Sequence, residues 1–315
     1  MTAKLRIGTR GSKLALTQCA WVRQRIVQAM GEDDARAEEI APLVVITTQG
    51  DRIQDRRLIE AGGKALFTRE IEDALSRGDI DIAVHSLKDV PAAEVPGLRL
   101  CAFPPREDAR DAFLSPLHAG MDDLPRGARL GTASLRRQAQ ALSRRPDLDI
   151  VMMRGNVDTR LRKLREGACD ALLLAAAGLN RLGLASEIRS YIDPDLYATA
   201  PGQGALAIQC RTNDLGAAWM GKVHDAATCL CVEAERGALE ALEASCRTAV
   251  GAYARLDGEA LEIFVEALSG DGAIRWQRRA RLEAATPERA RRLGFSLGAE
   301  IRAEAGPHLI VAGDG

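Results

Sequence analysis

The sequence predicts an α/β protein with two similar units, followed by a smaller α+β unit. In the first part of the chain, short apolar runs alternate with longer amphipathic stretches. The alternation stops at a Pro-bearing stretch at residues 103–107 and then begins again. From about residue 225, one long Ala/Glu/Leu-rich stretch leads into three runs of alternating apolar and polar residues. We therefore expect three domains, with boundaries at 1–104 plus 203–222, 105–202 and 223–315.

The first unit shows the order of strands and helices expected for a sheet with mainly parallel strands. Its helix at 64–77 places Leu66, Ile71 and Leu75 at helical spacing. An apolar strand at 205–209 is placed to return to this unit after the second one. The other expected elements are strands at 4–8, 43–48 and 81–85 and a helix at 13–30.

The second unit repeats this alternation, and the third departs from it. In the third, turns at Asp257-Gly258 and at 270–272 separate the alternating runs, which predicts an antiparallel meander. Thr286-Pro287 predicts the start of a last helix, since Pro is favoured at the first helical position. The expected strands lie at 112–115, 128–131, 149–153, 170–175, 250–256, 261–268 and 274–281, and the expected helices at 134–144, 156–166, 226–244 and 286–305.

Composition excludes several classes of function. With 43 basic and 44 acidic residues the net charge is -1, and only 3% of residues are aromatic, which argues against nucleic-acid binding by the whole molecule. We expect no membrane partner and a cytoplasmic location, because the sequence shows no signal-peptide h-region and no run of 18 apolar residues. Seven irregularly spaced cysteines fit a reducing compartment. We expect no metal site, since Cys229 and Cys231 lie two apart on a helix and do not face each other.

Basic residues gather between residues 126 and 166, where eleven Lys or Arg stand against four acids. Arg136 and Arg137 fall in the first turn of a helix, and Arg154 ends a strand just before the next helix. Strand C-termini and helix N-termini line the ligand crevice of an open α/β sheet, and free backbone N–H groups there favour anions. We predict that these three arginines bind a polyanion. For Arg144, Arg145 and residues 162–165 we favour solvated surface charge.

Residues 8–12 (GTRGS) repeat this arrangement at the first strand-to-helix turn, with Arg10 and Ser12. The spacing is neither that of a Walker loop nor that of a Rossmann fingerprint. Two interpretations stay open: an anion site, or an ordinary N-cap by Ser12.

The stretch from Asp81 to Pro91 is the most informative. A buried strand ends in the polar residues His85, Ser86, Lys88 and Asp89, which are costly at a buried edge unless they are hydrogen-bonded or useful. A carboxylate beside cations stays ionised yet can shuttle a proton. The alternative is an ion pair between Lys88 and Asp89, which adjacent positions on an extended segment disfavour.

For Cys246, residue-level reasoning favours a small buried side chain.

Seven motifs, taken together and in order, resemble the porphobilinogen deaminase family. They cover nearly the whole chain, with the C-terminal part matching least distinctly. They are GTRGS (8–12), GGKALF (62–67), VHSLKDVP (84–91), GTASLRRQ (131–138), RGNVDTR (154–160), AAGLNR (176–181) and PGQG (201–204).

The resemblance implies an enzyme that joins four porphobilinogen molecules head to tail, with loss of ammonia, into hydroxymethylbilane, a step of tetrapyrrole (haem) biosynthesis. It implies two domains similar to type II periplasmic binding proteins that form a cleft, and a third domain that carries a dipyrromethane cofactor as a thioether on Cys246. Asp89 matches the family's catalytic aspartate. We expect a monomer that binds the small-molecule substrate. The positions that match its substrate- and cofactor-binding residues are Arg10, Ser12, Lys64, Ser86, Lys88, Thr132, Ser134, Arg136, Arg137, Arg154, Gly155, Arg160, Arg181 and Gln203.

Some positions depart from the family pattern. Glu60 lies where many members have Lys, Ala244-Ser245 replaces Gly-Gly before Cys246, and Ala249 replaces a common Pro. Two other functions remain as alternatives from the residues alone. A solute-binding module would carry no covalent adduct and would not need Asp89, and a nucleic-acid binder would show steep salt dependence.

Overall fold

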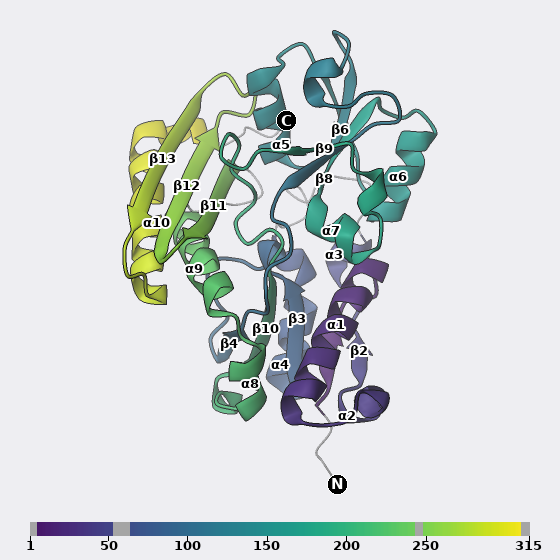
Figure 1. Cartoon of the computed structure of the whole chain (residues 1–315), viewed down its shortest axis with the longest axis vertical. Coiled ribbons are helices and arrows are strands. Elements are labelled where there is room, and N and C mark those ends of the chain that lie inside the picture. The colour runs from purple at the N-terminus through teal and green to yellow at the C-terminus, as the bar shows by residue number, and fades with distance from the viewer. Residues whose placement is uncertain (1–4, 53–63, 243–247, 310–315) are drawn as a thin grey trace. The chain divides into compact units, whose positions relative to one another are not determined.

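The computed structural model describes residues 5–52, 64–242 and 248–309. The chain divides into two compact units (Figure 1). Unit 1 contains Met1–Glu107 and Ala205–Cys229, and unit 2 contains Asp108–Gly204 and Leu230–Gly315. The three-domain division expected from the sequence stays a prediction.

Unit 1 contains a five-stranded sheet in the order β2-β1-β3-β10-β4. Strand β1 pairs in parallel with β2 and β3, whereas β10 runs antiparallel to both of its neighbours. The sheet is therefore mixed, because the strand that returns from unit 2 enters it in the opposite direction. The strands are β1 (Ile7–Thr9), β2 (Leu43–Val45), β3 (Ile82–Ser86), β4 (Leu98–Ala102) and β10 (Leu206–Arg211).

Helices cover both faces of this sheet. On one face, α1 buries Cys19, Val22 and Ile26 against β1, β3 and β10. On the other face, α4 buries Ile71 and Leu75. The helices are α1 (Lys13–Met30), α2 (Ala37–Ile40), α3 (Gln49–Arg52), α4 (Arg69–Arg77) and α8 (Ala218–Val223), with short 3₁₀ helices η3 (Lys64–Phe67) and η4 (Leu87–Asp89).

The first part of unit 2 contains a second five-stranded sheet in the order β7-β6-β8-β5-β9. Here β6 pairs in parallel with β7 and β8, and β5 runs antiparallel to β8 and β9. The elements are β5 (Asp111–Leu114), β6 (Arg129–Thr132), β7 (Asp149–Met152), β8 (Ala171–Ala175), β9 (Ser190–Ile192), α5 (Leu135–Arg144), α6 (Val157–Arg165) and α7 (Ala176–Arg181).

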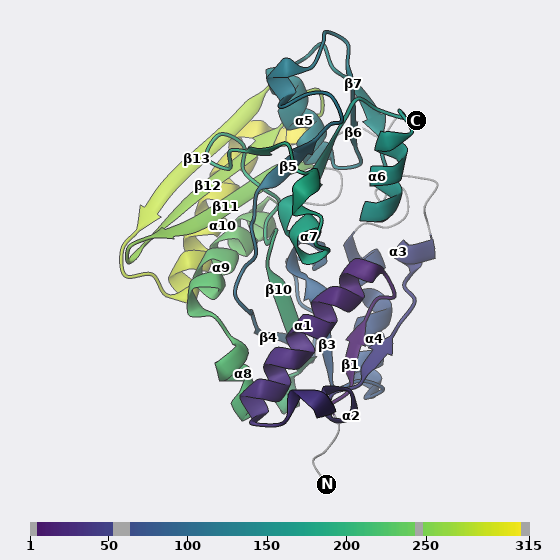
Figure 2. The same cartoon turned by 45° about the vertical axis from the view of Figure 1, so that its right-hand side comes forward.

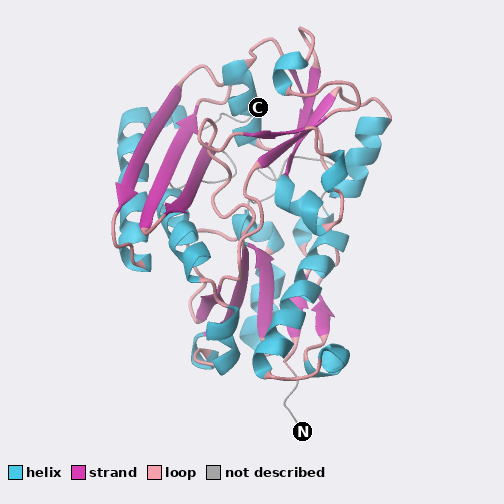
Figure 3. Cartoon of the chain, viewed as in Figure 1, coloured by secondary structure: helices cyan, strands magenta, loops and turns pink. Residues whose placement is uncertain are grey.

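The rest of unit 2 is a three-stranded antiparallel meander with two long helices, as Figure 3 shows by secondary structure. The first of these helices, α9, begins in the last residues of unit 1. The helices α9 and α10 pack side by side, since Gly237 and Gly294 meet the backbone of the partner helix. Figure 2 shows this part from a second direction. The elements are α9 (Ala226–Ala241), β11 (Ala249–Asp257), β12 (Ala260–Leu268), β13 (Arg275–Leu282) and α10 (Pro287–Ala305).

The expected fold class is confirmed: two α/β sheets and a C-terminal antiparallel sheet with helices. One expectation on a single element needs correction, because the helix expected at 64–77 is a 3₁₀ turn followed by α4. The strands of the two five-stranded sheets are mainly parallel, as expected, and the exceptions are β10 and β5, which run antiparallel to their neighbours. The sequence did not predict β4, β9, α7 and α8, of three to six residues each, because such short elements leave little periodicity.

Candidate functional site

Asp89 ends η4, directly after the central strand β3 of unit 1. Its side chain is half-buried, and within the described residues its carboxylate has no hydrogen bond or ion pair. Two other aspartates of unit 1 are engaged: Asp81 pairs with Arg6 at 2.8 Å and Asp51 with Arg10 at 2.5 Å. Asp89 is thus a partly desolvated carboxylate that remains open to a ligand.

The residues beside Asp89 are held by the sheet and by α1. The Ser86 hydroxyl donates to Gln18 Oε1 on α1 at 3.0 Å, and Leu87 N–H donates to the Ala205 carbonyl at 3.0 Å. Lys88 is half-buried between Leu87 and Asp89. These contacts fix the turn that presents Asp89.

The turn after β1 uses Ser12 as the N-cap of α1, since its hydroxyl accepts from Ala15 N–H at 3.2 Å. Arg10 forms its ion pair with Asp51 and lies 4.1 Å over the Phe67 ring. Burial alone would raise the pKa of Asp51, but Arg10 and Thr48 outweigh it and hold that pKa below its ordinary value. The capping interpretation is confirmed, and anion binding by Arg10 and Ser12 stays a prediction.

Several predicted site residues are not described by the structure. Cys246 lies outside the described residues, as do Glu60, Ala244 and Ser245. Lys64 begins η3, but its side chain is not described. Ala249 is the first residue of β11.

In unit 2, Arg136 and Arg137 are only 4% and 7% exposed and share the buried carboxylate of Asp111. Arg136 Nη1 lies 2.7 Å from Asp111 Oδ2, and Arg137 Nη2 lies 2.8 Å from Oδ1. Gln203 Nε2 donates to the same Oδ1 at 2.8 Å and also contacts Arg137. Two guanidinium groups against one carboxylate leave this cluster with a net positive charge.

This cluster changes the expected surroundings of Arg136 and Arg137 and shows that Asp111 belongs to the same group of residues. The sequence placed Arg136 and Arg137 at an open crevice, whereas the structure turns both onto a protein carboxylate; direct contact with a bound anion stays a prediction. Asp111 was missed, although an acidic residue at the head of the fully buried strand β5 was a usable signal. Burial favours a raised pKa for Asp111, but the ion pairs with Arg136 and Arg137 hold its pKa well below the ordinary range.

Hydroxyl and backbone donors lie at the ends of β6 and β7. Thr132 Oγ1 accepts from Ser134 N–H at 3.1 Å, and Ser134 caps α5. Gly155 has φ 113°, a conformation that favours glycine, and leads into α6. Arg154 and Arg160 are both half-buried in this region. The arrangement matches the turn after β1: a strand ending in Gly-Thr, then a Ser that caps a helix.

The remaining predicted residues in unit 2, Arg181 and Gln203, hold the segment that precedes β10. Arg181 Nη2 donates to the Gly204 carbonyl at 2.7 Å. Gln203 is fully buried and donates to the Ala109 carbonyl at 2.8 Å. Both therefore hold the loop at 201–204, and any contact with substrate stays a prediction.

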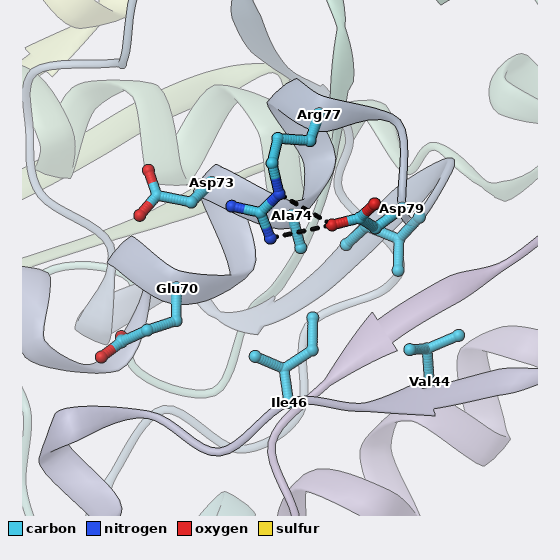
Figure 4. A pocket seen from close by; sticks show the side chains of 8 residues that line it. Val44, Ile46, Glu70, Asp73, Ala74, Arg77 and Asp79 are labelled. Atoms are coloured by element: carbon cyan, nitrogen blue, oxygen red, sulfur yellow. Dashed lines mark hydrogen bonds and ion pairs between the residues drawn. The ribbon is translucent and has the colours of Figure 1, made fainter.

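A cavity of about 340 Å³ in unit 1 lies between α4 and β2 (Figure 4). The side chains of Glu70, Asp73 and Arg77 line it together with Val44 and Ile46, and Arg77 pairs with Asp79. None of the predicted site residues lines this cavity. Across the described part of the chain, no group of three or more His, Cys, Asp or Glu residues could hold a metal, and no helix could cross a membrane.

Comparison with solved structures finds low similarity. The methionine binding protein MetQ aligns with 70% of this chain and 88% of its own, at 15% identity and a TM-score of 0.44.

Sequence comparison is far more specific. Residues 5–218 match the family described as "Porphobilinogen deaminase, dipyromethane cofactor binding domain", and residues 229–303 match "Porphobilinogen deaminase, C-terminal domain". A porphobilinogen deaminase of Caulobacter vibrioides is 57% identical over 314 residues, with 98% of each chain covered. One from Phenylobacterium zucineum is 54% identical over 314 residues, also with 98% of each chain covered. This chain therefore belongs to the porphobilinogen deaminase family.

Proposed function

We propose that this chain joins four porphobilinogen molecules into hydroxymethylbilane with Asp89 as the acid/base group. The reaction is that of its family, a transferase of tetrapyrrole biosynthesis. One observation supports the role of Asp89 above all. Its half-buried carboxylate lacks a protein partner within the described residues, whereas Asp51, Asp81 and Asp111 all have one.

The chemistry asks for a group that handles protons beside a cation. Porphobilinogen loses ammonia to give a cationic azafulvene, the free α-carbon of the growing chain attacks it, and a ring proton then leaves. The Asp89 carboxylate would orient the departing amine and accept hydrogen bonds from pyrrole N–H groups. It would also stabilise the cation and take up the ring proton. A carboxylate that is already held in an ion pair with an arginine would perform each of these roles less effectively.

Each added ring brings two carboxylates, which need positive partners in a partly desolvated site. We propose that basic residues contact them, and that Arg136 and Arg137 contribute mainly through the net charge that they retain beside Asp111. The proposed contacts are Arg10, Lys64, Lys88, Arg154, Arg160 and Arg181, with Ser12, Ser86, Thr132, Ser134, Gly155 and Gln203 as hydrogen-bonding or shaping positions. The division of the chain into three domains is part of this proposal.

We propose that dipyrromethane is held as a thioether on Cys246. When bound, this group supplies the free pyrrole α-carbon to which the first porphobilinogen is added. The guanidinium and hydroxyl donors at the ends of β6 and β7, which include Thr132, Ser134, Arg154 and Arg160, have the chemistry that its carboxylates require. We further propose a cytoplasmic monomer without a nucleic-acid partner, in keeping with the net charge of -1.

Asp89→Asn tests the acid/base role. The amide keeps the shape but removes the charge and the proton affinity, so we expect turnover to fall by roughly 10²- to 10⁴-fold. The thermal unfolding midpoint should stay close to that of the wild type, because no described ion pair is lost. Asp73→Asn, an exposed acid on α4, is the matched control. Near-normal formation of hydroxymethylbilane by the Asp89 variant would refute the assignment.

Intact mass under denaturing conditions tests the covalent group. We expect the purified protein to exceed its sequence mass by one dipyrromethane and Cys246→Ser to lose the whole increment. Cys101→Ser, at a free half-buried cysteine, should keep it. An increment that survives in the Cys246 variant would place the attachment elsewhere.

A further inference from the structure

Three buried polar side chains form a chain in unit 1 close to Asp89. They come from different elements: Glu72 from α4, Gln209 from β10 and His85 from β3. Gln209 Nε2 donates to Glu72 Oε1 at 3.2 Å, and His85 Nε2 lies 3.0 Å from Gln209 Oε1. The exposed fractions of Glu72, Gln209 and His85 are 8%, 1% and 6%. Burying three polar groups costs stability, so their arrangement needs a reason.

The Gln209 amide sets the direction of these hydrogen bonds, because its NH₂ group faces Glu72 Oε1 and its carbonyl oxygen faces His85. A carbonyl oxygen can only accept, so His85 Nε2 must carry a proton. In the neutral ring, Nδ1 is then unprotonated.

The charges around His85 come from three elements. Glu72 acts on it from α4, Asp89 from η4 and Arg10 from the turn after β1. Burial lowers the pKa of His85 below its ordinary value, and Glu72, the hydrogen bond to Gln209 and Asp89 oppose this only in part. The neutral Gln209 amide lies between the ring and Glu72, so the Glu72 carboxylate does not accept the hydrogen bond from Nε2–H directly.

We propose that Gln209 fixes the buried, neutral His85 ring in the Nε2–H form and keeps the Glu72 carboxylate from contacting it directly, so that no imidazolium lies beside the reacting carboxylate of Asp89. This rests on the proposed role of Asp89. An imidazolium would stabilise the ionised form of Asp89 and weaken it as a proton acceptor. His85 and Gln209 are thus positioning residues, which act through Asp89.

Nitrogen NMR of the imidazoles tests the hydrogen-bond chain without reference to catalysis. The chain has four histidines, and the signal lost in His85→Gln assigns His85. In the wild type we expect the Nε2–H tautomer and a protonation midpoint below the ordinary value of histidine. In Gln209→Glu the new carboxylate accepts the hydrogen bond from Nε2–H and favours the charged ring, so the pKa of His85 should rise by about one unit or more. A protonated or Nδ1–H ring in the wild type, or an unchanged titration in Gln209→Glu, would overturn the proposal.

The pH dependence of kcat tests the link to Asp89. In Gln209→Glu the acidic limb should move to lower pH by about half a unit, and turnover at neutral pH should fall several-fold. The double variant with His85→Gln should lose both effects, and His85→Gln alone should leave the limb where the wild type has it. Gln24→Glu adds the same charge on the exposed face of α1 as a control. If the NMR result holds but the limb does not move, the link to Asp89 is wrong. Normal turnover by Asp89→Asn would instead refute the proposed function while leaving the NMR readout valid.

Discussion

The Asp111 carboxylate accepts hydrogen bonds from Arg136, Arg137 and Gln203 in a region closed to water. The network continues from Arg136 through Gln140 to the buried Glu266 on β12. It therefore joins the second five-stranded sheet to the three-stranded sheet within unit 2. Asp111, which was not predicted from the sequence, thus holds the two predicted residues Arg136 and Arg137.

The lowered pKa of Asp111 predicts how the free energy of unfolding changes at acidic pH. Its folded-state pKa lies below the unfolded value of about 3.9, so the ion pairs contribute fully above about pH 4. That contribution is lost as the pH falls toward the folded-state value.

Asp111→Asn should lower the free energy of unfolding by about 3–5 kcal/mol, because it leaves two buried guanidinium groups without their counter-charge. It should also remove the part of the free energy of unfolding that is lost when Asp111 becomes protonated. Denaturant unfolding at pH 7 and at about pH 2 measures both effects. Asp257→Asn removes only an exposed ion pair with Arg281 and should leave the midpoint almost unchanged. Equal midpoints for the two variants would contradict the argument.

At the scale of elements, glycines set how closely α9 and α10 approach. A Cβ on Gly294 would lie 1.8 Å from the Ala234 carbonyl oxygen, and one on Gly237 would lie 2.1 Å from the Arg291 carbonyl oxygen. Neither neighbour is a flexible side chain, so the helices would have to move apart. This packing holds α10 and α9 together beside the three-stranded sheet.

Gly294→Ala should therefore destabilise the protein by roughly 1–3 kcal/mol, although alanine is the better helix former. Gly221→Ala on α8 is the matched control, because a Cβ there meets nothing within 4 Å. That control should gain about 0.5–1 kcal/mol. Thermal unfolding of both variants measures the difference, and a stabilised Gly294 variant would show that the helices are free to adjust.

The elements best predicted from the sequence carried their own end signals. Helix α1 starts after Ser12 and ends before Gly31, which adopts φ 77°, and both bounds agree with the prediction. The meander strands lie within a residue or so of the expected ranges, since turns containing Asp-Gly separate them. Strand β9 has three residues and is placed by pairing with β5, a signal that no local pattern carries.

At the scale of the whole molecule, unit 1 is built from two distant segments of the chain. Strand β10 lies between β3 and β4, so the segment Met1–Glu107 lacks an inner strand of its own sheet. Register pairs such as Ala207 with His85 also place Gln209 next to the elements that carry Glu72 and His85. Completion of this sheet therefore requires the return of the chain after unit 2.

A polypeptide of residues 1–107 should consequently fail to fold, because a gap of one strand exposes both β3 and β4. The same segment joined by a flexible linker to residues 205–229 should give a cooperative thermal transition, since the sheet is then complete. Circular dichroism measures both. Cooperative unfolding of 1–107 alone would show that β10 is dispensable.

Local sequence was enough to predict the α/β and antiparallel parts, the helix caps and Asp89 at the end of its strand, because these depend on residues close together in the chain. It could not predict that Arg136 and Arg137 share Asp111, 25 and 26 residues away, with Gln203 from 92 residues away. Nor could it place Gln209, which is 124 residues from His85, between that ring and Glu72. Ion pairs and hydrogen bonds form by distance in space, so the partners of a charged side chain are decided only when sheet order and register bring remote segments together.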